Sequence, residues 1–340
     1  MCSNIFCIAP EEVDIVYFII LLIATILNCL IALGSLLFIL RHLIRRLRGQ
    51  VPSSPSDYPP ISIVMPCYLP NEQHIIESSI DYMLTKLEYP ARLTMYIVYN
   101  TPTKLQIEDR LLALDGRDYA PNRLLRVVEA AGSTSKAENL NYVLQLVDDA
   151  LVALYDADHH PDPPSLMHMR NALAEYDCDA VQGSTYLRDT EGSVVSKIVN
   201  AEFFVTHFVY FPAMEMLSGT GYFGGSNALW RTNVLRKYGF DASVHTEDVD
   251  LSARVILDQH RIHFCSHARS GELSPAGPWA LMTQRLRWFV GWEQVTRKFY
   301  WRVFWSPLSP LRKLGFCYMF HLRWGLLLAG LVGAVINPVI

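Results

Sequence analysis

Two carboxylates follow an apolar run near the middle of this 340-residue chain. Residues 151–155 read LVALY, and Asp156-Ala157-Asp158 comes directly after them. In an extended segment the side chains at i and i+2 point to the same side, so Asp156 and Asp158 can share one hard cation. Such a cation would neutralise a diphosphate. Acidic pairs also occur in solvated loops, but the apolar run before this one favours a metal site.

A second acidic group, Thr246-Glu247-Asp248, precedes residues 249–257, whose apolar residues have helical spacing. A partly desolvated carboxylate in a cleft can accept the proton of an attacking hydroxyl, which makes Asp248 a candidate general base. The alternative is structural. Thr246 is a plausible N-cap, and acidic residues in the first turn interact favourably with the helix dipole.

A third motif reads Gln284-Arg285-Leu286-Arg287-Trp288. In a helix, Gln284, Arg287 and Trp288 stand at i, i+3 and i+4 and share one face. The Arg287 guanidinium can bind a diphosphate through two hydrogen bonds, and the Trp288 ring can stack on a sugar. The alternative is an interfacial helix whose arginines extend to water.

Short apolar runs alternate with helical patterns around the first motif. This alternation predicts an α/β fold with a doubly wound parallel sheet, in which ligands bind beyond the carboxyl ends of the strands. The predicted strands are residues 61–66, 93–99, 124–128, 151–155 and 180–183, and the predicted helices are 72–86, 135–146 and 164–176.

Residues 15–40 contain no charged side chain. A helix of this length spans roughly 39 Å, which is enough to cross a bilayer with some tilt. Acidic residues precede this segment and four arginines follow it at 41, 45, 46 and 48. The positive-inside rule therefore places residues 1–14 in the extracellular or lumenal space and the rest of the chain in the cytosol. A basic, proline-rich linker covers residues 41–60.

The second half of the chain is rich in aromatic residues. Residues 194–217 and 289–304 either lie in a membrane interface, with 294–313 as an interfacial segment, or form core helices. Residues 314–340 are mostly apolar and are expected to be a second transmembrane helix of an incomplete membrane region. The host membrane, plasma membrane or Golgi, is not distinguished.

The composition excludes some classes of protein. Hydrophobic residues make up 51% of the chain and charged residues 18%, so part of it is unusually apolar. A net charge of -4 gives no basic surface for nucleic acid. The seven cysteines are scattered without metal-binding spacing, and we expect reduced thiols, with Cys2 and Cys7 able to pair only if they lie outside.

Together and in this order, the motifs resemble those of the family 2 glycosyltransferases, particularly the processive membrane synthases of cellulose, hyaluronan and chitin. The resemblance runs from about residue 60 to residue 292. It is carried by the three motifs above and by three further segments, namely residues 66–72 (PCYLPNE), 135–141 (SKAENLN) and 223–228 (FGGSNA).

This resemblance implies a GT-A fold over residues 61–293 and inversion at the sugar carbon. Asp156 and Asp158 would hold Mg²⁺ or Mn²⁺ on the donor diphosphate, and Asp248 would be the catalytic base. The implied donor-binding residues are Tyr68, Glu72, Asn100, Lys136, Asp156 and Arg287. The implied acceptor-binding residues are Trp288, Gly224, Gly225, Glu247 and Gln284.

One position departs from the family pattern. After the second strand, family members usually carry aspartates that contact the nucleotide base, whereas this chain has Asn100, whose amide can still hydrogen-bond a uracil. The favoured hypothesis is a synthase that transfers glucose or N-acetylglucosamine from a UDP-sugar to a growing β-linked polysaccharide, alone or with a membrane partner or as an oligomer. A transferase to a lipid, similar to the ceramide glucosyltransferases, and an inactive assembly subunit are the alternatives.

Overall fold

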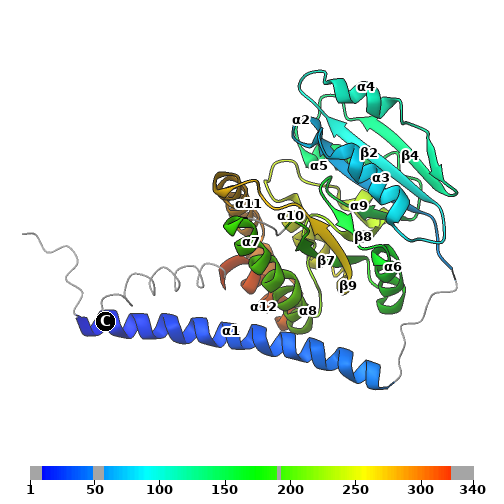
Figure 1. The fold of residues 1–340 in the computed structure, drawn as a ribbon. Helices are drawn as coiled ribbons and strands as arrows, with labels where there is room; N and C mark the ends of the chain where they lie inside the picture. Colours follow the sequence, from blue (N-terminus) through cyan, green and yellow to red (C-terminus); the bar gives the residue numbers. More distant parts are fainter. Residues whose placement is uncertain (1–9, 49–56, 190–192, 323–340) are drawn as a thin grey trace, which may run out of the picture.

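The computed structural model describes residues 10–48, 57–189 and 193–322. Its centre is a nine-stranded sheet in the order β3-β4-β2-β1-β5-β8-β7-β9-β6. Helices cover both faces of this sheet, and the long helix α1 (Pro10–Leu47) runs past one end of it, alongside α8 and α12 (Figure 1). The α/β fold expected from the sequence is therefore present.

One half of the sheet is parallel, as predicted. The strands β1 (Ile61–Tyr68), β2 (Leu93–Asn100), β4 (Arg123–Glu129) and β5 (Leu151–Leu154) pair in parallel in the order β4-β2-β1-β5. Strands buried on both faces read as continuous apolar runs, which is why they are visible in the sequence.

The other half is mixed, so the prediction of a wholly parallel sheet is wrong there. The strand β8 (Ala228–Arg231) runs antiparallel between β5 and β7 (Ala180–Leu187). It does so because the chain leaves β7 at the carboxyl edge of the sheet and re-enters at that same edge. The strand β9 (Ile262–Glu272) then pairs in parallel with β7, and two short strands, β3 (Asp118–Ala120) and β6 (His160–Pro161), pair antiparallel at the margins.

Alternate residues of the central strands pack on opposite helical layers. In β1, Ile61, Ile63 and Met65 join one apolar cluster, and Val64 joins the other. The first cluster includes residues of α3 (Ile76–Lys86), α4 (Gln106–Leu112) and α6 (Ser165–Tyr176). The second includes residues of α5 (Lys136–Leu144), α9 (Thr232–Tyr238), α10 (Glu247–Leu257) and α11 (Pro278–Phe304). The domain is thus three layers thick.

The predicted helices are present, with one correction. The stretch expected to be one helix over 72–86 consists of α2 (Leu69–Glu72), a turn and then α3. Glu72 therefore closes a short helix immediately after β1. Ser135 is the N-cap of α5, where its hydroxyl accepts a hydrogen bond from the backbone N–H of Glu138 at 3.2 Å.

Two helical stretches among the described residues are long and apolar enough to cross a membrane, residues 21–47 in α1 and residues 194–218. The second comprises α7 (Val194–Phe204), the π-helical turn η1 (Val205–Tyr210) and α8 (Phe211–Ser218). The helix α12 (Pro310–Cys317) and the π-helical turn η2 (Tyr318–Leu322) follow α11. Most of the transmembrane helix expected over 314–340 lies outside the described residues.

The aromatic segments form helices that contribute to the core, as one interpretation held, and they also carry exposed side chains. Phe203 and Phe299 are buried in the domain, whereas Phe204 and Trp301 are exposed. All five cysteines in the described part of the chain are free thiols, as expected, and Cys2 and Cys7 lie outside it.

The helix α11 packs closely against the start of α10. A Cβ on Gly291 would lie 2.6 Å from Thr246 Cγ2 and 2.7 Å from the Thr246 backbone nitrogen. Three residues further along α11, the Gln294 side chain accepts a hydrogen bond from the His245 N–H at 2.9 Å. Gly291 therefore permits a helix contact directly beside Glu247 and Asp248.

Substitution Gly291→Ala should destabilise the protein, because the added methyl group pushes α11 away from Thr246. We expect a loss of about 1–3 kcal/mol, partly offset by the better helix propensity of alanine. A lowered melting temperature in detergent would be the observation.

The matched control is Gly277→Ala, at the N-terminus of the same helix, where nothing lies within 4 Å of an added Cβ. An unchanged melting temperature for Gly291→Ala would contradict this account of the contact.

Candidate active site

The ends of several strands gather the predicted site residues at one edge of the sheet. The strand β1 ends at Tyr68, β2 ends at Asn100, and β5 ends two residues before Asp156. Because β8 is antiparallel, its first residue, Ala228, pairs with the last residue of β5, Leu154. The turn that contains Gly224 and Gly225 therefore lies at this edge as well.

The two aspartates after β5 lie in a turn, so the expectation of an extended segment is wrong. The backbone N–H of His159 donates to the carbonyl oxygen of Asp156 at 3.1 Å, which closes the turn. The Asp156 N–H in turn donates to Ser226 Oγ at 2.9 Å. This second bond ties the aspartate pair to the turn that carries the two glycines.

A buried histidine, His159, directly follows the aspartate pair in the chain. His159 Nε2 lies 3.2 Å from Glu272 Oε2, and His159 Nδ1 lies 2.9 Å from Ser270 Oγ. Burial lowers the pKa of His159, but the Glu272 carboxylate and the nearby aspartates raise it more, so the net shift is upward. Burial likewise raises the pKa of Asp158, and Asp156 adds to that rise.

Glu72 faces the same carboxylates from the end of α2. Burial raises its pKa to about 7, the hydrogen bond with Cys67 opposes this, and the charges of Asp156 and Asp158 contribute to the rise. Tyr68, four residues earlier, is exposed. This edge of the sheet thus concentrates negative charge in a partly buried place.

These residues fit a hard divalent cation whose coordination shell is completed by oxygens of a bound substrate and of water. Crowded carboxylates with raised pKa values are relieved by a cation, and carboxylate oxygens are the ligands that Mg²⁺ and Mn²⁺ prefer. Across the residues described, no group of three or more His, Cys, Asp or Glu side chains is arranged to hold a metal by itself. Asp156 and Asp158 would therefore share the ion with phosphate oxygens and water, as is usual for Mg²⁺.

Asp248 lies in the first turn of α10, next to Glu247 and close enough to Lys136 for their charges to interact. Burial and the charge of Glu247 raise the pKa of Asp248 and the charge of Lys136 lowers it, so that it lies at about 7. Thr246 occupies the N-cap position but makes no capping hydrogen bond through its side chain. The capping interpretation of this motif is therefore wrong for the Thr246 hydroxyl.

The glycine turn brings the backbone against Asp248. Gly225 has a φ of 89°, and a Cβ there would lie 3.1 Å from Asp248 Oδ2. The N–H of Gly224 donates to Oε1 of the buried Gln182 at 2.8 Å, and Gln182 Nε2 donates to the carbonyl oxygen of Ser226 at 2.9 Å. The turn is therefore held in place from inside the sheet.

Lys136, the first residue of α5, links the two acidic groups. Its ammonium lies 2.5 Å from Asp156 Oδ1 and 3.8 Å from Glu247 Oε1, and it donates to the Gly225 carbonyl oxygen at 3.0 Å. Burial lowers the pKa of Lys136, but the carboxylates of Asp156, Glu247 and Asp248 raise it more, so the amine stays charged.

Asn100 is buried at the end of β2 and already makes internal hydrogen bonds. Its Nδ2 donates to the Ser133 carbonyl oxygen at 3.0 Å, and its Oδ1 accepts from Asn139 Nδ2 at 2.7 Å. A uracil could use only the remaining hydrogen-bonding capacity of this amide.

The residues predicted on α11 point to two adjoining faces. Arg287 is exposed and lies one turn before Gly291, which contacts Thr246, so it stands on the face toward the acidic motif. Trp288 packs against a small cluster formed by Leu187, Val199 and Phe203.

The Trp288 ring has a cation over it. The guanidinium of Arg285 lies 4.1 Å from the ring centroid, donates to Glu202 at 2.8 Å and also donates to Gln284 Oε1 at 3.1 Å. Trp288 and Gln284 therefore contact other side chains of the protein, and helical spacing alone did not reveal these contacts.

Three contributors to the site were missed in the sequence. The His159–Glu272 pair joins residues more than 100 positions apart, and Gly291 shows its role only through the contact with Thr246. Gln182 was also missed, and the available signal was a long polar side chain in the predicted buried strand that became β7.

Comparisons with known proteins identify the family of the chain. The family model described as "Glycosyltransferase like family 2" matches residues 59–291. Among curated proteins, the chain is 26% identical over 295 residues, 86% of its length, to the beta-monoglucosyldiacylglycerol synthase of a Nostoc species. It is 23% identical over 266 residues, 78% of its length, to the poly-beta-1,6-N-acetyl-D-glucosamine synthase of Staphylococcus epidermidis. It spans 59% and 62% of the lengths of these two relatives.

Among solved structures, the fold is similar to that of a mannosyltransferase from Pyrobaculum calidifontis in complex with GDP-mannose and Mn²⁺. The TM-score is 0.62 at 20% identity, over 93% of this chain and 87% of the other. The sheet edge with its acidic motifs, the fold and the family match lead to one conclusion: this chain belongs to glycosyltransferase family 2 and has the GT-A fold.

Proposed function

We propose that this protein is an inverting glycosyltransferase that transfers glucose or N-acetylglucosamine from a UDP-sugar to a growing β-linked polysaccharide at a membrane. The observation that carries this proposal is the placement of Asp248. Burial raises the pKa of this carboxylate to about 7, and the carboxylate lies beside the same glycine turn that receives the amine of Lys136, itself paired with Asp156.

In the proposed reaction, Asp248 accepts the proton of an acceptor hydroxyl. The hydroxyl oxygen attacks the anomeric carbon from the side opposite the diphosphate, and the bond from that carbon to the phosphate oxygen breaks. A single displacement of this kind inverts the configuration. Lys136 and Arg287 would bind the departing diphosphate, and a divalent ion held by Asp156 and Asp158 would neutralise its developing charge.

We also propose that α1 crosses the membrane with its C-terminal end on the cytosolic side. Support comes from the basic residues at that end, which lie against the catalytic domain. Arg45 makes an ion pair with Glu175 and a hydrogen bond with the Tyr176 hydroxyl, both in the last turn of α6. The catalytic domain and the basic end of the helix would thus share one side.

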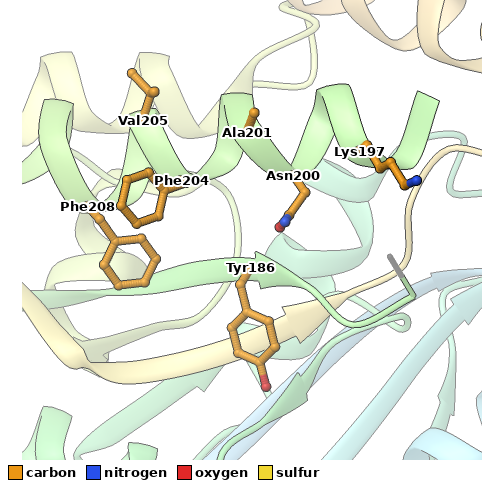
Figure 2. Close-up of a pocket in the computed structure, with 7 residues that line it drawn as sticks. All are labelled: Tyr186, Lys197, Asn200, Ala201, Phe204, Val205 and Phe208. Atoms are coloured by element: carbon orange, nitrogen blue, oxygen red, sulfur yellow. The ribbon is translucent and has the colours of Figure 1, made fainter. Parts of the chain in front are cut away.

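A second candidate, transfer to a lipid, is favoured by a pocket beside α7. The pocket has a volume of about 380 Å³ and is lined by Tyr186, Lys197, Asn200, Ala201, Phe204, Val205 and Phe208. In Figure 2, Lys197 lies at one end of the residues that line the pocket, and Phe204 and Phe208 lie at the other end. Apolar side chains beside an amine and an amide suit a lipid with a polar head, and one relative is named as a glycolipid synthase.

Base catalysis by Asp248 predicts a pH dependence. The carboxylate must be deprotonated to accept a proton, so kcat/KM should fall as the pH decreases through about 7. Asp248→Asn should lower kcat by at least about 100-fold. Steady-state release of UDP between pH 5 and 9 measures both effects.

Glu72, whose pKa is also about 7, provides the control for this profile. If Glu72→Gln abolished the pH dependence while Asp248→Asn kept full activity, Asp248 would not be the base. Full biological function of Asp248→Asn would instead favour an inactive assembly subunit.

The donor and metal assignments predict that nucleotide release requires Mg²⁺ or Mn²⁺ and a UDP-sugar. Purified full-length protein should release UDP from UDP-glucose or UDP-N-acetylglucosamine, and EDTA or Asp156→Asn should reduce the rate by at least about tenfold. Sizing of the product distinguishes a polymer from a single transfer. Release from GDP-mannose alone would contradict the choice of UDP.

The pocket makes a separate prediction about acceptors. Ala201→Trp should fill the pocket and raise KM for diacylglycerol or ceramide in mixed micelles by about tenfold, because burial of each CH₂ group contributes roughly 0.8 kcal/mol. Turnover with a soluble glycan acceptor should not change. Ile198→Trp is the control, since Ile198 is exposed on α7 but does not line the pocket. Equal KM values for the lipid in wild type and Ala201→Trp would exclude this pocket as the lipid site.

A further inference from the structure

The amine of Lys136 contacts three different segments of the site. It lies 2.5 Å from Asp156 Oδ1 in the turn after β5, 3.0 Å from the carbonyl oxygen of Gly225, and 3.8 Å from Glu247 Oε1 at the start of α10. An ammonium group has three N–H donors; the first two oxygens lie within hydrogen-bond distance of it, and the Glu247 oxygen lies at ion-pair distance. The lysine therefore joins the proposed metal side of the site to the proposed base side.

The position of this lysine is set by the backbone. Lys136 is the first residue of α5, directly after the N-cap Ser135. The side chain has only 30% of its surface exposed, and that of Glu247 only 12%. A cation in such a place interacts strongly with its carboxylate neighbours because little water screens the charges.

A divalent metal on Asp156 would need the carboxylate that the lysine contacts. Metal–oxygen distances for Mg²⁺ are about 2.1 Å. A metal and the ammonium bound to one carboxylate would thus lie within about 5 Å of each other, where like charges repel strongly. When a metal occupies the Asp156 carboxylate, Glu247 and the Gly225 carbonyl oxygen remain as partners for the Lys136 amine.

We propose that Lys136 is an internal counter-cation of Asp156 that a divalent metal must displace, so that metal binding moves the amine toward Glu247 while it keeps its hydrogen bond to Gly225. This inference rests on the proposed function, because it requires Asp156 to be a metal ligand. In it Lys136 is a positioning residue that makes metal binding and the charge near Asp248 interdependent.

The test is direct binding of Mn²⁺ to the full-length protein in detergent, followed by the EPR signal of free Mn²⁺ without any donor sugar. Lys136→Met removes the competing charge at similar length, so its affinity for Mn²⁺ should rise at least about fivefold above wild type. Unchanged or weaker binding by a folded Lys136→Met protein would overturn the proposal.

Two variants separate this proposal from the one it rests on. Asp156→Asn should weaken binding of Mn²⁺; if it does not, the metal site itself is wrong. Lys104→Met removes a comparable ion pair, the 2.9 Å contact with Asp109, between two exposed side chains of a different surface region. Its affinity for Mn²⁺ should equal that of wild type. An equal rise in affinity in both lysine variants would show that overall charge causes the effect, which would contradict the proposal.

A second measurement uses the wild-type protein, so it does not depend on whether a variant folds. Acetic anhydride labelling, read by mass spectrometry, reports how accessible and reactive each lysine amine is. Addition of Mn²⁺ should speed the labelling of Lys136 relative to Lys104, because the amine loses its closest partner. Equal or slower labelling of Lys136 would contradict displacement.

Discussion

Mutual repulsion of carboxylates at one edge of the sheet is the constraint on which the rest of the site depends. Asp156 and Asp158 follow β5, and Glu247 and Asp248 begin α10, so four acidic side chains come from two segments. Burial raises the pKa values of Asp158 and Asp248, and repulsion by the neighbouring carboxylates adds to the rise. Lys136 relieves part of the repulsion. In the proposed function, the same charges would receive a metal ion and a proton.

Buried amides hold the backbone that carries these charges. Gln182 in β7 bonds to both sides of the glycine turn, and Asn227, with a φ of 50°, donates from Nδ2 to the carbonyl oxygens of Ser184 and Ala268. Because a buried N–H group without a partner would be costly, the donating groups of these two amides favour one arrangement of the turn. The antiparallel β8 starts from this arrangement, which explains why the sheet changes direction beside the site.

The long helix α1 is attached to the catalytic domain by contacts of several kinds. Gly34 permits a close approach to the backbone of Ala213 in α8, where an added Cβ would lie 3.0 Å from the carbonyl oxygen. Near its end, Arg45 contacts Tyr176, whose ring stacks on His263 with centroids 3.8 Å apart. Small residues at helix crossings and polar contacts at helix ends fix the orientation of the domain relative to α1.

The sequence by itself determined the parallel half of the sheet, the acidic pair after β5 and the start of α10, because buried strands and amphipathic helices have local patterns. It did not determine that β8 is antiparallel, that Asp156 lies in a turn, or that Trp288 packs under Arg285. These depend on segments distant in the chain, such as Gly291 against Thr246, and no local spacing encodes such contacts. The sequence therefore identified the types of chemical group. Only tertiary packing decided the distances, the burial and the shared charges that make these groups a site.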